Sequence, residues 1–445
     1  MAAHEQAVGT VTSHDGIEVK RRTAIKGAFF TEFVDMFDIY LPVVVLTPVL
    51  GYFQPAEIEP GLAAILNSFI FITTLLGRPV GALIFGRMAD RIGRRKSSII
   101  SVVGFGIFTL LIALLPSYQT IGISSYLLLL LLRFLDGVCL GGGYTASHPL
   151  AMEYSRKDQR GFVGGLIIAA FPAAYVAISL VALVMFALVP LDGMDSPYAV
   201  WGWRIPFIIG AALAGWLAYY YWKKVSESEV WQVKTKEGIK KPAAARLFRG
   251  SNVRKLAQVL LMMTGFWTTQ NIITIYMPSA LLAQTLKLSK FELTTTLIIT
   301  YCILFFSYIG AGILGQKIGR RRAFIILGVL IATAGVGLLY TLANSAGAPL
   351  PQIILLVCML AVLVTAPWGV IITYINERFA TEVRATGFGI GFSLSVVLPS
   401  FYAVYLGWLG NLVSPQAAPA VLLFIGAVIA TIGAAMGEET RDVDF

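Results

Sequence analysis

The residues best placed to do chemistry are ionisable side chains inside long apolar stretches of the sequence. They are Glu32, Asp35, Asp38, Arg78, Arg133 and Asp136. A charged group in such surroundings costs about 2.5 to 3.5 kcal/mol on membrane-insertion scales, so each is a functional candidate. The three carboxylates within 27–50 recur every third residue, which places them on one broad face of a helix. The set has four carboxylates and two guanidiniums, a formal excess of two negative charges.

A carboxyl group that exchanges a proton near neutral pH is what a proton-coupled carrier requires. Low-dielectric surroundings and crowding of like charges favour the protonated form of at least one of these carboxyls. With a rise of about 1.5 Å per residue, Asp38 and Arg133 lie at similar depths near the middle of a membrane. Asp35 and Arg78 are matched in the same way. We therefore predict Asp38 or Asp35 as the proton site, with Arg133 as its ion-pair partner or as the anchor of an anionic solute. The alternative is that all six residues form static salt bridges between helices.

The second half of the chain offers uncharged polar and aromatic side chains instead, within 256–282 and 352–376. Neutral hydrogen-bonding groups beside aromatic rings are suited to orienting a small polar solute. The residues that we assign to such a cavity are Gln270, Asn271, Tyr276, Trp368, Tyr374 and Asn376. Each of them is equally suited to hold two helices together. His148 precedes Pro149 at an expected helix kink, where a local structural role and a proton relay are the alternatives.

The composition identifies the surroundings of these residues as lipid. Of 445 residues, 57% are hydrophobic and 13% are charged, against about 25% charged in a soluble domain. A helix that spans a bilayer needs roughly 20 apolar residues. Twelve such stretches are predicted, at 27–50, 62–86, 97–115, 123–150, 162–189, 203–222, 256–282, 293–315, 323–342, 352–376, 385–409 and 418–436.

The net charge of +10 reflects topology rather than a nucleic-acid partner. If both termini are cytoplasmic, 29 of the 34 Lys and Arg residues fall in cytoplasmic segments. This asymmetry follows the positive-inside rule and orients the chain. The polar first 26 residues lack the features of a secretory signal, and no Asn-x-Ser/Thr glycosylation acceptor occurs. We expect a multi-pass protein of a bacterial cytoplasmic membrane, surrounded by lipid.

Cofactor and nucleotide chemistry is not expected. Cys139, Cys302 and Cys358 lie within apolar stretches at spacings that suit neither a metal nor a disulfide framework. The string GRRKSS at 93–98 lacks the full phosphate-loop spacing, and the glycines of GFGIGF at 387–392 are best interpreted as helix-packing sites. The chain is therefore predicted not to be an enzyme and to hold no cofactor or metal. Transport by this chain is predicted either to use an ion gradient or to follow the gradient of the solute itself.

Two patterns recur at nearly the same offset and indicate an internal duplication. GRMADRIGRRK, which occupies 86–96, reappears as GILGQKIGRRR at 312–322, an offset of 226 residues. The second pattern, an acid seven residues before an arginine, comprises Glu153 with Arg160 and Glu377 with Arg384, an offset of 224. Offsets of about half the chain length predict two similar six-helix bundles.

The string at 86–96 resembles the loop signature of the major facilitator superfamily, and the resemblance extends over essentially the whole chain. RPVGALIFGRMADRIGRR, RFLDGVCLGGG and WGWRIPF resemble segments of its metabolite:proton symporters, relatives of the sugar porters. TEFVDMFDIY is similar to the first-helix pattern of that group and, through Asp35-x-x-Asp38, to the aromatic acid:proton symporters. The chain departs from the symporters at Asp136, where they have Gln, and at Gly143, where they have Glu. The resemblance implies alternating access between two halves around a mid-membrane site.

The repeated motifs are predicted to form the cytoplasmic gate. Gly86 and Gly93 permit a tight reversal between helices. In the family that the chain resembles, the acid at Asp90 lies against the start of helix 11, here near Ala385, so we predict a conformational latch, weaker at its neutral counterpart Gln316. The predicted gating set is Gly86, Asp90, Arg91, Gly93, Arg94, Arg95, Glu153, Arg160, Arg320, Arg321, Glu377 and Arg384. Spacing suggests that Glu153 pairs with Arg160 and that Glu377 pairs with Arg384.

The sequence thus predicts an all-α integral membrane protein with twelve transmembrane helices in two pseudo-symmetric bundles. The predicted divisions are a cytoplasmic tail at 1–26, bundles at 27–222 and 256–436 with a cytoplasmic linker at 223–255 between them, and a cytoplasmic tail at 437–445. The predicted function is secondary active transport, with protons as the coupling ion and a small organic acid as the solute, by a monomer. The alternatives are a uniporter or exporter of an amine, sugar or drug-like solute, and a membrane sensor, for which the predicted tails are short.

Overall fold

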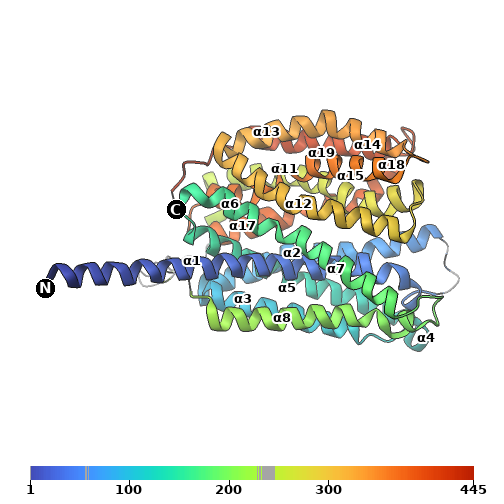
Figure 1. Cartoon of the computed structure of the whole chain (residues 1–445), viewed down its shortest axis with the longest axis horizontal. Helices are drawn as coiled ribbons and strands as arrows, with labels where there is room; N and C mark the ends of the chain where they lie inside the picture. The colour runs from blue at the N-terminus through green and yellow to red at the C-terminus, as the bar shows by residue number, and fades with distance from the viewer. Residues whose placement is uncertain are drawn as a thin grey trace.

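The chain forms α-helices gathered into two bundles that lie side by side (Figure 1). The computed structural model describes the backbone of residues 2–55, 58, 60–227, 229, 232 and 246–444. It describes the side chains of the same residues except 2–15, 47, 60–65, 68 and 90. The described backbone contains no β-strand. About half of the predicted linker 223–255, namely residues 228, 230, 231 and 233–245, lies outside the described residues.

The first bundle contains the elements from α1 to α8. They are α1 (Ala2–Leu41), η1 (Pro42–Leu46), η2 (Thr47–Tyr52), α2 (Pro60–Ile92), α3 (Arg94–Ala113), α4 (Tyr118–Ile121), α5 (Ser124–Tyr154), η3 (Lys157–Gln159), α6 (Arg160–Ile168), α7 (Ala170–Leu188), η4 (Tyr198–Gly202) and α8 (Arg204–Lys224). The backbone of the predicted tail 1–26 is helical from Ala2 and continuous with the first span.

The second bundle contains the elements from α11 to α19. They are α11 (Ser251–Asn271), η5 (Ile272–Thr285), α12 (Lys290–Ile318), α13 (Arg320–Leu330), η6 (Ile331–Gly335), α14 (Val336–Ala343), α15 (Leu350–Thr365), α16 (Trp368–Arg378), α17 (Arg384–Ser393), η7 (Leu394–Val396), η8 (Pro399–Phe401), α18 (Tyr402–Leu409) and α19 (Ala418–Ala435). The start of α12 is a capping box, in which Ser289 and Glu292 satisfy each other's backbone N–H groups.

The described helices supply the predicted membrane spans. Ten helical segments of the described chain are long and apolar enough to cross a bilayer. The other two predicted spans are α1 with η1 and η2, and α11 with η5, and both carry polar residues along their length. Their polar residues are buried in the bundles; Asp35 is 1% exposed and Thr269 is 0% exposed. With these two units the twelve-helix prediction is confirmed.

The apolar side chains divide between the interior and the lipid-facing surface. Large residues such as Phe306 and Val404 are 72% and 64% exposed, respectively. A soluble protein rarely exposes extended apolar surface of this kind, whereas lipid is a favourable solvent for it. The helices are therefore apolar on both sides, and their polar residues gather where the helices face one another.

The two bundles meet along small residues. The helix α17 packs against α2 and α5, and α12 packs against α6 and α7. At the second contact, a Cβ atom on Gly161 would lie 2.4 Å from the carbonyl oxygen of Gly312. At the first, a Cβ atom on Gly389 would lie 2.4 Å from Thr145 Oγ1. These close approaches confirm the predicted packing role of the 387–392 glycines.

The predicted reversal after α2 depends on one of the two glycines named for it. Gly93 has φ of 102°, a left-handed conformation that favours glycine, and Gly319 repeats it in the second half with φ of 99°. The prediction for Gly86 is wrong, because this residue lies inside α2. A Cβ atom on Gly86 would be 3.4 Å from Thr386 Oγ1, so its small size serves the contact between the halves.

Candidate functional site

Two carboxylates of α1 and one arginine of α2 meet beside α5 on the side of the first half that faces the second. Asp35 forms an ion pair with Arg78, as depth matching predicted. The guanidinium of Arg78 lies 4.7 Å from the centroid of the Tyr144 ring. Glu32 Oε2 lies 3.4 Å from His148 Nε2. We call Glu32, Asp35, Arg78 and His148 the interface cluster.

The interface cluster borders the second half directly. The His148 ring packs edge to face on Phe388 with the centroids 5.4 Å apart. The Tyr144 ring is 5.2 Å from that of Phe392, and its hydroxyl hydrogen-bonds Ser393. Both phenylalanines and Ser393 belong to α17. Movement between the halves would therefore change the surroundings of this cluster.

Several polar atoms of the interface cluster have no hydrogen-bond partner within the described part of the chain. They are both carboxylate oxygens of Glu32, Asp35 Oδ1, Arg78 Nε and both ring nitrogens of His148. The four residues are at most 1% exposed. Buried polar atoms are normally satisfied, so these are the atoms that a proton, a water or a polar solute would satisfy.

A second group of charges lies inside the first half, between α1, α3 and α5. Arg133 Nη1 donates to Asp38 Oδ2 at 3.0 Å and to Asp136 Oδ2 at 2.9 Å. Thr109 Oγ1 donates to Asp38 Oδ1 at 2.6 Å. We call Asp38, Thr109, Arg133 and Asp136 the internal cluster. It confirms the predicted pairing of Asp38 with Arg133.

The residues assigned to a cavity in the second half divide into two groups. Trp368 lies in an aromatic cluster with Trp267 and Phe392, at centroid distances of 4.5 and 5.9 Å. The indole N–H of Trp368 and Gln270 Oε1 are buried without a hydrogen-bond partner among the described residues. Tyr276 is half-buried. Gln270 and Trp368 thus retain polar atoms free for a solute.

The other residues of that set bind protein groups. Asn271 Nδ2 donates to the carbonyl of Pro399 at 2.9 Å, and Asn376 Nδ2 donates to that of Ile372 at 2.8 Å. The Tyr374 hydroxyl donates to Gln258 Oε1 at 3.2 Å. The contacts of Asn271 and Tyr374 match the alternative role, in which a polar residue holds helices together. The Asn376 contact lies within α16, and Asn376 Oδ1 is buried without a hydrogen-bond partner among the described residues.

The repeated acids and arginines form ion pairs that cross between the halves. Glu153 pairs with Arg94 of its own half and with Arg384 of the other at 3.1 Å. This crossing corrects the pairing within each half that spacing suggested, and it arises because the ends of α5 and α17 meet. All three side chains are buried.

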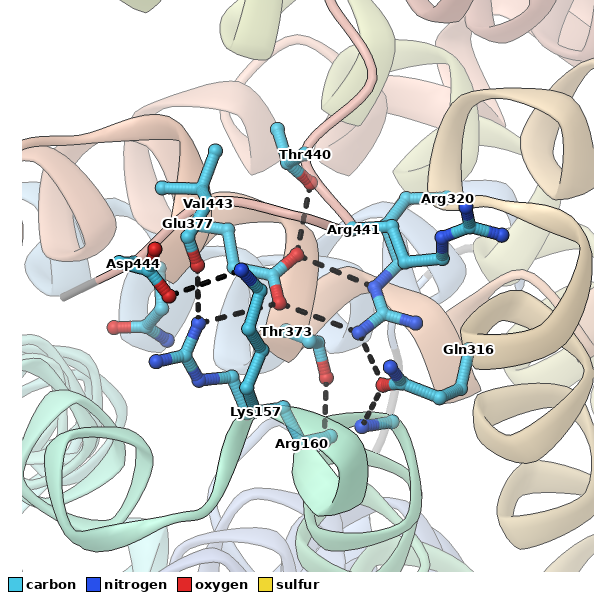
Figure 2. A network of polar contacts seen from close by, with 12 residues as sticks. Lys157, Arg160, Gln316, Arg320, Thr373, Glu377, Thr440, Arg441, Val443 and Asp444 are labelled. Carbon is cyan, nitrogen blue, oxygen red and sulfur yellow. Dashed lines mark hydrogen bonds and ion pairs between the residues drawn. The ribbon is translucent and has the colours of Figure 1, made fainter.

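The second copy of this arrangement lies at the end of α16 (Figure 2). Both carboxylate oxygens of Glu377 accept hydrogen bonds of 3.2 Å from Arg320, and Arg160 of the first half lies 4.0 Å away. Thr373 Oγ1 donates to the carbonyl of Arg160 at 3.0 Å. The predicted gate residues thus join the two halves at one end of the bundles.

The latch residues occupy equivalent places at the ends of α2 and α12. Gln316 Oε1 accepts a hydrogen bond of 3.0 Å from the backbone N–H of Gly161, at the start of α6 (Figure 2). An acceptor there satisfies one of the free N–H groups of a helix N-terminus. Asp90 is the equivalent residue of α2, and its side chain lies outside the described residues. The Asp90 latch therefore stays a prediction.

Two acids that were not predicted from the sequence cap helices beside the predicted gate. Glu227 accepts from the backbone N–H groups of Arg94 and Arg95 at 2.9 and 3.1 Å. Glu439 accepts from those of Arg320 and Arg321 at 2.8 and 3.1 Å. The signal was present, because an acidic run follows the last helix of each half, SESE at 226–229 and EE at 438–439. A carboxylate at a helix N-terminus is favourable.

The remaining gate arginines have simpler contacts. Arg95 Nε donates to the carbonyl of Tyr221 at 3.1 Å, and Arg321 Nη2 donates to that of Ala435 at 2.7 Å. Both therefore bind the carbonyl end of the last helix of their half, where a cation is favourable. Arg91 is exposed, in agreement with a role in membrane orientation.

Comparison with known proteins gives relatives along the whole chain. The chain is 28% identical to the inner membrane metabolite transport protein YhjE of Escherichia coli, over 91% of this chain and 92% of that protein. It is 28% identical to a proline/betaine transporter of Salmonella typhimurium, covering 98% and 86%, respectively. It is also 28% identical to a citrate-proton symporter of Klebsiella pneumoniae, covering 86% and 85%.

The fold is that of a solved transporter. The structure of the proton:xylose symporter XylE bound to 6-bromo-6-deoxy-D-glucose superposes with a TM-score of 0.75 at 17% identity, covering 94% of each chain. Residues 28–310 match the family model of the Major Facilitator Superfamily. The chain belongs to the Major Facilitator Superfamily, and it is a membrane transporter rather than an enzyme.

Proposed function

We propose that this transporter imports a small carboxylate-bearing solute together with protons across a bacterial inner membrane. The observation that carries the proposal is the ion pair between Asp35 and Arg78, buried at the boundary between the halves. A carboxylate on the solute and the carboxylate of Asp35 would compete for the same guanidinium. This competition is a direct way to couple a proton to an anion.

The proposed coupling has two states. With Asp35 ionised, Arg78 is neutralised by the protein and offers little to an anion. When Asp35 takes up a proton, the guanidinium loses its partner in a low-dielectric site, where an uncompensated charge is unfavourable. A solute carboxylate then restores the balance with a bidentate pair of hydrogen bonds. Solute and proton would thus bind together and leave together as the halves rock.

The relatives support the solute class and the location. Citrate, proline and betaine all carry a carboxylate, and one of the named relatives couples its solute to protons. Another is an inner membrane protein. The distribution of Lys and Arg supports two cytoplasmic termini. In the second half, Gln270 and the Trp368 indole are proposed to orient the neutral part of the solute.

Uptake into proteoliposomes with an imposed pH gradient tests this proposal. Citrate, 2-oxoglutarate, proline and glycine betaine are offered to purified protein with the lumen more alkaline than the medium. We expect at least one to be taken up faster with the gradient than without it, and a protonophore to remove the difference. Carboxylate uptake that ignores the gradient would exclude symport.

A matched variant separates proton coupling from binding. Asp35→Asn keeps the size of the side chain but cannot ionise, so gradient-driven accumulation should be lost while solute exchange across the membrane persists. Asp442→Asn, at an exposed position on the cytoplasmic face, serves as the control. An Asp35→Asn protein that still accumulates solute against its gradient would contradict the role of Asp35.

One observation favours a second candidate, the transport of an amine. Glu32 is a buried carboxylate whose two oxygens accept no hydrogen bond from the described residues. An ammonium group could satisfy it. Release of a preloaded monoamine without a carboxylate from the lumen, driven by the same pH gradient, would favour this candidate over carboxylate import.

A further inference from the structure

The last residues of the described chain cross the cytoplasmic face from the second half toward the first (Figure 2). We call 437–444 the C-terminal strap. It follows α19, the last helix of the second half, and lies over the buried pair of Arg160 and Glu377.

The first part of the strap is attached to its own half. Arg378 forms an ion pair with Glu438, and its hydrogen bond holds the pKa of Glu438 below the usual value. Thr440 Oγ1 donates to Glu377 Oε2 at 2.8 Å, in a site where Thr440 is 2% exposed. Arg441 Nη1 donates to the carbonyl of Lys317 at 3.1 Å. With the Glu439 cap, these contacts place the strap at a fixed position on the second half.

The final part of the strap is bound by the first half. Arg160 Nη1 donates to the backbone carbonyl of Val443 at 2.7 Å. Lys157 Nζ lies 2.9 Å from Asp444 Oδ1. Arg160 begins α6 and Lys157 lies in η3 just before it, so one short segment connects the two halves at the point where they must separate.

We propose that the C-terminal strap is a lock that holds the cytoplasmic side of the transporter closed. The buried Arg160 side chain is shared between Glu377 and the Val443 carbonyl, both carried by the second half. An inward opening must break these contacts together with the Lys157 contact. Without the strap, water would reach Glu377 and Arg160, and an ion pair in water contributes little. The strap therefore favours the state in which the cytoplasmic side is closed.

The strongest test truncates the chain after Glu439, which deletes the part of the strap that binds the first half, and measures the opening of the cytoplasmic side. The reporter is Ala385→Cys, a 2% exposed residue of α17 near the boundary, in a protein whose Cys139, Cys302 and Cys358 are replaced by serine. A maleimide that does not cross membranes is applied from the cytoplasmic side, without solute. We expect labelling to be about fivefold faster in the truncated protein, which corresponds to about 1 kcal/mol.

The matched control is Asp442→Asn in the intact strap. Asp442 is exposed and contacts Arg441 of the strap itself, so its labelling should equal that of the parent protein. A truncated protein that folds, as judged by its gel-filtration profile, and is labelled at the parental rate would overturn the proposal. Because no solute is present, this outcome would leave the proposed carboxylate symport untouched.

A cross-link tests the same lock without a deletion. In the cysteine-replaced background, Lys157→Cys and Asp444→Cys are combined and oxidised. If the strap must leave the first half during the cycle, the cross-link should reduce labelling of Ala385→Cys to background, and dithiothreitol should restore it. Unchanged labelling in the fully cross-linked protein would show that the cytoplasmic side opens with the strap in place, and the proposal would fail.

Discussion

The two buried charge clusters of the first half are similar in composition and different in surroundings. Each joins one arginine to two carboxylates, Arg78 to Asp35 and its neighbour Glu32 in one, and Arg133 to Asp38 and Asp136 in the other. In the internal cluster both carboxylates accept hydrogen bonds from the arginine. In the interface cluster Glu32 accepts none from the described residues, and its neighbours contact α17 of the other half.

This difference indicates which cluster can take part in transport. Alternating access moves one half of the fold against the other, while contacts within a half are kept. The partners of Asp38 all belong to α3 and α5, which move with it. The partners of the interface cluster change when α17 moves away from α5. We therefore expect proton coupling in the interface cluster and a structural role for the internal cluster.

The largest expected effect is the loss of protein stability when the internal cluster is disrupted. Arg133→Met should lower the free energy of unfolding by about 3 to 5 kcal/mol, because it leaves two buried carboxylates without a cation. Thermal denaturation of the purified protein measures this loss. Adding Asp38→Asn and Asp136→Asn removes the uncompensated charge and should restore most of the stability. A triple variant that is stable and still shows gradient-driven uptake would establish that the internal cluster is structural.

The second prediction compares one carboxylate from each cluster. Asp35→Asn should reduce gradient-driven uptake by about 100-fold, equivalent to about 2.8 kcal/mol, because Arg78 no longer has a partner that titrates. Asp38→Asn should keep the dependence of uptake on the pH gradient while lowering the melting temperature. The opposite result, with coupling lost in Asp38→Asn and retained in Asp35→Asn, would reverse the assignment of the two clusters.

The sequence was sufficient to predict the spans, the duplication and the pairing of charges by depth. Hydropathy defines the spans because the bilayer fixes their length. Depth alone paired Asp38 with Arg133 and Asp35 with Arg78, since helices in a membrane lie nearly parallel. Depth says nothing about rotation about the helix axis, and so the sequence could not tell which pair faces the other half.

The contacts between the halves were the other feature that the sequence could not provide. Residues seven apart suggested that Glu153 pairs with Arg160, whereas the structure pairs Glu153 with Arg384, more than 200 residues away. Such a pairing depends on how two bundles dock, which local spacing does not encode. The acid caps Glu227 and Glu439 were not predicted because each binds the N-terminus of a helix more than 100 residues away, a contact that local spacing does not encode.

The third prediction measures a neutral member of the internal cluster. Thr109→Val has nearly the same shape but removes the hydroxyl that donates to Asp38. Loss of a hydrogen bond to a charged group should lower the free energy of unfolding by about 1.5 to 3 kcal/mol. Uptake per folded molecule should respond to the pH gradient as in the parent protein. A change in the proton-to-solute ratio would mean that the internal cluster participates in coupling after all.

The smallest expected effect is on solute affinity, through the aromatic cluster of Trp267, Trp368 and Phe392 in the second half. Trp368→Phe keeps the aromatic packing on Trp267 and Phe392 but removes the indole N–H, which has no partner among the described residues. If this group donates to the solute, its loss should weaken binding by about 1 kcal/mol, or about fivefold. Trp267→Phe is the matched control, because the Trp267 indole already donates to the carbonyl of Phe392 at 3.0 Å. This substitution should therefore affect stability more than solute affinity. Isothermal titration of both variants with the transported solute distinguishes these effects. Equal affinity in Trp368→Phe and the parent protein would exclude the Trp368 indole from solute recognition and would leave Gln270 as the polar group proposed for that role in the second half.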